Sequence, residues 1–106
     1  MLGFGPAIES VSTAQLADRL KASKLVLIDV REPWEYAEGH VKGAANVPLG
    51  QLPERLGRMD SGAETFVICA HGNRSIAAVK KLKRAGFDHV FNVKGGTAAW
   101  QGKLIR

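Results

Sequence analysis

The sequence predicts an α/β fold built on a short, mostly parallel sheet with helices on its flanks. Two runs, Leu25-Val-Leu-Ile28 and Thr65-Phe-Val-Ile68, are almost continuously apolar. Such runs are typical of strands buried on both faces of a parallel sheet. Helix-like segments alternate with them, which is the order of an α/β protein. The 106 residues fit one domain, so we expect a single domain over 1–106 with its core at about 9–102.

The first helix is predicted from its start signal. Ser12 is a good N-cap, and Gln15 three residues later completes the pattern of a capping box. The helix should therefore cover about residues 13–21, and Leu16 and Leu20 should face the core.

Two short helices and a brief extended segment are expected between the apolar strands. The segment 32–39 carries Pro33 in its first turn and ends at Gly39, which suits a short helix. An extended piece is predicted at residues 46–47, and another short helix at about 49–57.

A longer helix should follow the second strand. Between residues 74 and 85 apolar side chains recur every three positions with lysines between them, and Gly86 follows. This pattern predicts an amphipathic helix that ends at the glycine. A last strand at 90–93 and a terminal helix at 95–100 complete the alternation.

Composition excludes several classes of function. The formal net charge is +5, but the densest basic stretch, residues 80–84, lies near a predicted helix C-terminus, where cations suit the helix dipole. No nucleic-acid motif accompanies it, so we expect small anions rather than nucleic acid as partners. No apolar run approaches the ~20 residues of a membrane span. One cysteine cannot form an internal disulfide. We therefore expect no membrane association and a cytoplasmic location.

Cys69 is the residue whose position points most directly to chemistry. It follows a predicted strand and lies five residues before Arg74, which begins a predicted helix. Parallel α/β sheets bind ligands at this edge. The intervening residues, Ala70-His-Gly-Asn73, are small or turn-forming, so successive backbone amides can point inward and cradle an anion. Those amides, the helix dipole and Arg74 would lower the pKa of the thiol. The alternative is that Cys69 is a small buried hydrophobic residue.

Three segments carry a family resemblance and occur in the family's order. They are Leu27-Ile-Asp-Val-Arg-Glu-Pro-Trp-Glu-Tyr-Ala-Glu-Gly-His-Val-Lys-Gly-Ala-Ala-Asn-Val-Pro48, Cys69-Ala-His-Gly-Asn-Arg-Ser75 and Val93-Lys-Gly-Gly-Thr-Ala-Ala-Trp100. With them the chain resembles a single-domain rhodanese, or thiosulfate sulfurtransferase, over about residues 9–100. The resemblance implies a rhodanese-like three-layer sandwich.

The resemblance also implies a persulfide mechanism, which is a form of covalent catalysis. Cys69 would attack a small anionic sulfur donor such as thiosulfate and pass the sulfur to cyanide or to a thiol, including a protein thiol. The substrate-binding role falls on the loop that follows, namely Ala70, His71, Gly72, Asn73 and Arg74. No metal or organic cofactor is expected.

Supporting residues are expected around this loop. The resemblance places Asp29 and Arg31 beneath or beside the loop and Ser75 directly after it, and all three are expected to support it. Asp29 could instead only cap the following helix. His71 either faces the thiolate or points to solvent.

The remaining polar and aromatic residues near these motifs have plainer expected roles. Glu32, Glu35 and Glu38 are predicted to form a solvated helix face. Trp34 and Trp100 are predicted to be packing residues rather than substrate platforms.

Departures from the family pattern leave alternatives open. Many relatives carry arginine where this chain has Ala70, so thiosulfate affinity should be modest. A sulfur carrier without turnover, or a regulatory module, fits the same motifs. A phosphatase-like enzyme would have five residues between its cysteine and arginine, and this chain has four. An arsenate reductase would normally need further thiols.

Overall fold

A fully parallel sheet organises the part of the chain that the structure describes. The computed structural model describes residues 7–106, and within them five strands pair in the order β1-β5-β4-β2-β3. The strands are β1 (Ser10–Val11), β2 (Val26–Asp29), β3 (Ala45–Asn46), β4 (Thr65–Ile68) and β5 (Val90–Val93). Each neighbouring pair is parallel. The predicted α/β fold class is confirmed, and the sheet is parallel throughout its described strands rather than mostly parallel.

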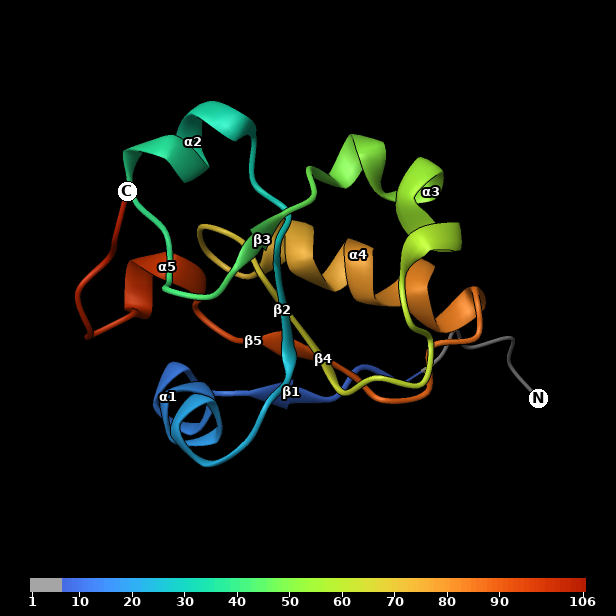
Figure 1. Cartoon of the computed structure of the whole chain (residues 1–106), viewed down its shortest axis with the longest axis horizontal. Helices are drawn as coiled ribbons and strands as arrows, with labels where there is room; N and C mark the ends of the chain where they lie inside the picture. Colours follow the sequence, from blue (N-terminus) through green and yellow to red (C-terminus); the bar gives the residue numbers. More distant parts are fainter. Residues whose placement is uncertain (1–6) are drawn as a thin grey trace.

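Helices cover both faces of this sheet and make three layers (Figure 1). They are α1 (Thr13–Ala22), α2 (Pro33–Glu38), α3 (Leu52–Arg55), α4 (Asn73–Arg84) and α5 (Gly96–Ala99). On the face of α3 and α4, the core contains Val67, Val79 and Leu82. On the face of α1, it contains Leu16 and Phe66. None of the helices in the described part of the chain is long and apolar enough to cross a membrane.

Local signals in the sequence placed most helix ends well. The capping box is present, because Gln15 N donates to Ser12 Oγ at 3.0 Å and Ser12 N donates to Gln15 Oε1 at 2.8 Å. The helix expected at 49–57 is instead broken into α3 with a 3-10 turn on each side. Pro53 accounts for the break before α3, since it has no amide hydrogen to donate to the preceding turn. Strand β1 was not predicted because two residues are too few to show a strand pattern.

A buried ion pair closes the carboxyl end of β2. The Asp29 side chain is fully buried, and Arg31 is 6% exposed. Arg31 Nη2 donates to Asp29 Oδ2 at 2.8 Å and to the carbonyl oxygen of Gly39 at 2.7 Å. Asn46 Nδ2 donates to the carbonyl oxygens of Asp29 and Arg31 at 3.0 and 2.9 Å. These bonds join the end of β2 to the end of α2 and to β3.

Asp29→Asn should therefore destabilise the fold strongly. The substitution leaves the Arg31 guanidinium buried without its counter-charge, which costs about 3–5 kcal/mol of unfolding free energy. Urea denaturation measures this cost. The matched control is Glu64→Gln, which breaks the Arg19–Glu64 pair on the surface, where the side chains are 45% and 32% exposed. That change should cost at most about 1 kcal/mol. Equal losses in the two variants would contradict the structural role of the buried pair.

Candidate active site

Cys69 lies at the carboxyl edge of the sheet, between the last residue of β4 and the first turn of α4. The segment Cys69–Arg74 forms the turn into that helix, and we call it the active loop. Its parent strand β4 is flanked by β2 and β5, both parallel to it. The ends of parallel strands thus meet around this loop, as expected for a ligand site in an α/β sheet.

The Cys69 sulfur is enclosed by hydrogen-bonding groups. The residue is 1% exposed. Gly72 N donates to Sγ at 3.0 Å, and Ser75 Oγ lies 3.3 Å from Sγ. Burial alone raises the pKa of the thiol, but hydrogen bonds from the Ser75 side chain and from the backbone amides of Ser75, Gly72 and His71 outweigh it. The pKa of Cys69 is therefore below its ordinary value, which favours the nucleophilic thiolate.

Helix α5 holds the active loop in the conformation that turns its amides toward the sulfur. Thr97 N donates to the Cys69 carbonyl at 2.8 Å, and Ala98 N donates to the Ala70 carbonyl at 3.0 Å. Gly96 has a φ of +63°, and a Cβ at this position would lie 2.3 Å from the Cys69 oxygen. Only glycine allows this approach. Gly72 also adopts a left-handed conformation, with φ of +104°, as the N-cap of α4.

Arg74 makes a bidentate ion pair with Glu35 rather than a hydrogen bond to the sulfur. Its Nη1 and Nη2 donate to the two Glu35 oxygens at 2.7 and 3.0 Å. The hydrogen bond with Arg74 is the main reason why the pKa of Glu35 falls to about 2. The Arg74 pKa is raised, mainly by Glu35 and to a lesser extent by the charge of Cys69. The expectation that Glu35 belongs to a solvated face was wrong, because it anchors the active loop to α2.

The other candidate residues are placed as follows. Asp29 and Arg31 bond to each other and to the segment after β2, and no side-chain hydrogen bond described for them reaches the active loop. Asp29 does not cap α2, whose N-cap is Glu32. Trp34, expected to be a packing residue, is 65% exposed.

The remaining side chains of the active loop differ in their exposure. His71 and Asn73 are exposed, Ala70 is half-buried, and the Gly72 residue is buried. Within residues 7–106 no group of three or more His, Cys, Asp or Glu is placed to hold a metal ion.

Two partners of the site were not predicted from the sequence. Asn92 accepts a hydrogen bond from Ser75 Oγ at 2.5 Å, and both side chains are buried. Glu35, which pairs with Arg74, was predicted to lie on a solvated helix face. Asn92 carried a usable signal, since it is the polar residue within the otherwise apolar run Val90-Phe-Asn-Val93. Glu35 carried none, because glutamates at exposed and paired helix positions look alike in sequence.

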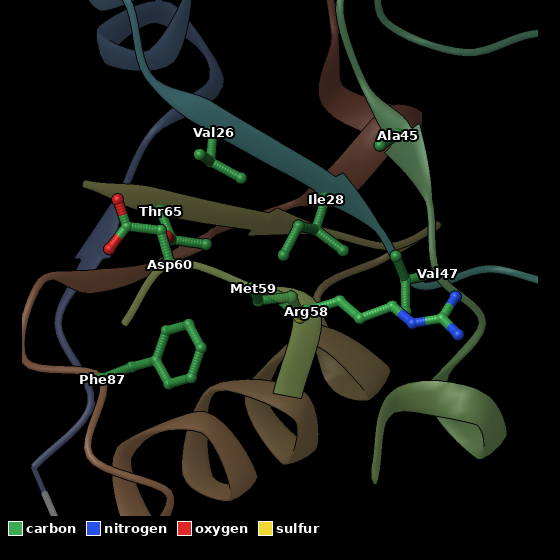
Figure 2. Close-up of a pocket in the computed structure, with 9 residues that line it drawn as sticks. All are labelled: Val26, Ile28, Ala45, Val47, Arg58, Met59, Asp60, Thr65 and Phe87. Carbon is green, nitrogen blue, oxygen red and sulfur yellow. The ribbon is translucent and has the colours of Figure 1, made fainter. Parts of the chain in front are cut away.

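The structure also contains an apolar cavity, whose lining residues are shown in Figure 2. It has a volume of about 240 Å³, and Val26 and Thr65, the first residues of β2 and β4, line it together with Met59 and Phe87. Cys69 follows the last residue of β4, at the other end of that strand. No residue of the active loop lines this cavity.

Comparisons with known proteins agree on one family. A family model described as a rhodanese-like domain matches residues 12–103. The chain is 41% identical over 97 residues to a Bacillus subtilis (strain 168) protein named "Putative sulfurtransferase YtwF", with 91% of this chain and 93% of that protein covered. The crystal structure of a rhodanese-like domain protein from Staphylococcus aureus matches with a TM-score of 0.85 and 32% identity, covering 93% of this chain and 99% of that one.

A further relative is longer than this chain. The chain is 38% identical over 79 residues to the Bacillus subtilis (strain 168) protein named "Putative sulfur carrier protein YrkF". The match covers 74% of this chain and 43% of that relative, so this chain corresponds to less than half of it.

Ser75→Ala should raise the pKa of Cys69. The substitution removes a donor to the thiolate while the burial that disfavours the anion remains. The midpoint of the pH dependence of Cys69 alkylation by iodoacetamide should move upward by about one unit. Ser61→Ala, at an exposed position, is the matched control and should leave the midpoint in place. A downward or absent shift in Ser75→Ala would contradict this assignment of the donor.

Glu35→Gln should remove a contribution to stability that the wild type has at neutral pH and loses in acid. The Glu35 pKa falls from 4.5 to about 2 on folding, so the ion pair contributes fully above 4.5. That contribution is lost as pH falls toward 2. The difference in Tm between wild type and Glu35→Gln should therefore be largest above pH 4.5 and shrink toward zero near pH 2. Glu38→Gln, at an exposed position of the same helix, is the control for removing a charge. A pH-independent difference would show that the pair with Arg74 does not cause the effect.

Proposed function

The chain belongs to the rhodanese-like domain family, and we propose that it moves a sulfane sulfur from a small anionic donor to a thiophilic acceptor through a persulfide on Cys69. The observation that carries this proposal is the setting of the Cys69 sulfur. It is buried, and hydrogen bonds from the Ser75 side chain and from the backbone amides of His71, Gly72 and Ser75 lower its pKa. Such a site stabilises a sulfur anion, which is the form needed both before and after transfer.

The first half of the proposed cycle loads the cysteine. The Cys69 thiolate attacks the outer sulfur of thiosulfate, and a sulfur–sulfur bond forms. The bond between that outer sulfur and the sulfonate sulfur breaks, and sulfite leaves with its electron pair. The total charge of minus three is the same on both sides. The product is a Cys69 persulfide anion.

The second half returns the cysteine to its starting state. Cyanide or a thiolate attacks the outer sulfur of the persulfide, and the Cys69 thiolate leaves. Thiocyanate or a new persulfide is the product. In this cycle the cysteine itself carries the sulfur, so it calls for no metal or organic cofactor.

The active loop supplies the binding groups in this proposal. The backbone amides from Ala70 to Arg74 receive the donor anion and then the outer sulfur of the persulfide. The Arg74 side chain is 37% exposed while it pairs with Glu35, and its charge also interacts with that of Cys69. His71 is an exposed residue of the active loop, where it would meet an incoming donor or partner. We place the protein in the cytoplasm, where a lone thiol stays reduced.

A second candidate function is that of a sulfur carrier. The match to a protein named as a sulfur carrier favours it. A carrier would load once and release its sulfur only to one protein thiol, whereas an enzyme would turn over with small acceptors. A phosphatase-like reaction is disfavoured by the four residues between Cys69 and Arg74, and arsenate reduction by the single cysteine.

Intact mass spectrometry tests the proposed cycle. Wild-type protein incubated with thiosulfate and desalted should gain one sulfur atom, and cyanide should remove it with formation of thiocyanate. Cys69→Ala should fold normally and gain nothing, because it lacks the nucleophile. Sulfur loading in Cys69→Ala would refute the assignment of Cys69 as the nucleophile. Loading without turnover on cyanide would favour the carrier, and a wild type that no sulfur donor loads would refute both.

A further inference from the structure

A hydrogen-bonded series of polar side chains, Ser75, Asn92 and Ser10, runs from the Cys69 sulfur to β1, and its first two members are buried. Sγ lies 3.3 Å from Ser75 Oγ, which donates to Asn92 Oδ1 at 2.5 Å. Asn92 Nδ2 donates to Ser10 Oγ at 3.2 Å. Ser75 and Asn92 are 0% and 2% exposed, and Ser10 and Asn92 are paired in register between β1 and β5. The series thus starts at the thiol and ends at an exposed hydroxyl.

The hydrogen positions in this arrangement are those of a neutral thiol. Ser75 has one hydroxyl hydrogen, and it is directed at Asn92 Oδ1. The thiol hydrogen of Cys69 then points at the Ser75 oxygen. Each member donates to the next, so every buried donor in the series has an acceptor.

A thiolate cannot be accommodated by the same hydrogen positions. Without its proton the sulfur keeps the Gly72 amide as a donor but no longer donates to Ser75, so no hydrogen lies between Sγ and the Ser75 oxygen unless the Ser75 hydroxyl rotates toward the sulfur. The Ser75 oxygen would then face Asn92 Oδ1 with no hydrogen between them. An amide cannot pass a proton along, but a half-turn of the Asn92 amide exchanges its oxygen and nitrogen. Nδ2 then donates to Ser75, and Ser10, whose hydroxyl is exposed, donates to Oδ1.

We propose that Asn92 is a positioning residue. Its side-chain amide rotates by a half-turn when Cys69 loses its proton, so that Ser75 can donate a hydrogen bond to the sulfur anion. The thiol proton leaves to water, and no covalent bond within the series is made or broken. Both states leave the buried groups fully hydrogen-bonded, which a fixed acceptor in place of Asn92 could not achieve. The inference deepens the proposed function, because it concerns the anion that this function uses.

Other charged and titratable groups around Cys69 are the same in both states of the amide. They are Arg74 on α4, Glu32 and Glu35 on the α2 side, His71 in the active loop, and the Asp29–Arg31 pair after β2. The variants below leave all of these groups in place. Differences in the Cys69 alkylation midpoint between variants therefore report on the hydrogen-bonded series Ser75–Asn92–Ser10.

Side-chain NMR signals test the rotation of the Asn92 amide directly. The protein has three asparagines, so their side-chain NH₂ signals are few enough to assign. On raising the pH, the Asn92 NH₂ signals should shift with the same midpoint as alkylation of Cys69. Asn46 is the matched control. Its Nδ2 donates to the backbone carbonyls of Asp29 and Arg31, which are not part of the Ser75–Asn92–Ser10 series, so its signals should not follow that midpoint. The Asn92 response should vanish in Cys69→Ala and in Ser75→Ala. Asn92 signals that stay still while Cys69 titrates would overturn the proposal.

Asn92→Asp tests the consequence for the thiol. The carboxylate has the shape of the amide but no donor, so it holds the Ser75 hydroxyl and withholds it from the sulfur. The alkylation midpoint of Cys69 should rise by about one pH unit, a tenfold loss of thiolate below it. In a Ser75→Ala background the same change should shift the midpoint by less than half as much, since only the added charge acts there. An unchanged midpoint in Asn92→Asp, or equal shifts in the two backgrounds, would refute coupling through Ser75.

These measurements need no sulfur donor. Thermal unfolding first establishes that each variant is folded. If the protein shows the coupled titration but never loads sulfur, the role of Asn92 is supported and the proposed function is refuted. If it loads sulfur while the Asn92 amide stays fixed, the proposed function is supported and the role of Asn92 is refuted.

Discussion

The active site depends on one constraint, which is that a sulfur anion buried to 1% exposure must be surrounded by hydrogen-bond donors. Burial works against the charge, and only the donors reverse its effect on the pKa. The backbone of the active loop can supply them because α5 binds the carbonyl oxygens of Cys69 and Ala70 from behind. The close approach of Gly96 to that backbone is part of the same arrangement.

Polar groups buried at the edge of the sheet form two networks, one on each side of β4. On the β2 side, Asp29, Arg31 and Asn46 join strand ends to α2 and β3. On the β5 side, Ser75 and Asn92 connect the thiol to β1. The first network is an ion pair within the fold, and the second contacts the sulfur. The buried members of both networks lie in strands, in the first turn of α4 or, for Arg31, just after β2, and their hydrogen bonds join neighbouring elements.

Much of the fold could be predicted from local patterns. Continuous apolar runs located β2 and β4, and the capping box located the start of α1. Edge strands were harder, because β1 and β3 have two residues each and depend on pairing with neighbours far along the chain. The break before α3 shows how one proline can interrupt an otherwise helical segment. Trp34 was misplaced because a large apolar residue suggests a packed position, whereas this one is 65% exposed.

Local residue patterns specify the order of elements, the position of Cys69 after a buried strand and the small residues that let the loop turn. The partners of the side chains around the loop depend instead on how distant elements pack. Arg74 meets Glu35 across 39 residues, and Ser75 meets Asn92 across 17. Such contacts follow from which strands and helices pack together, and no residue pattern within one element encodes them.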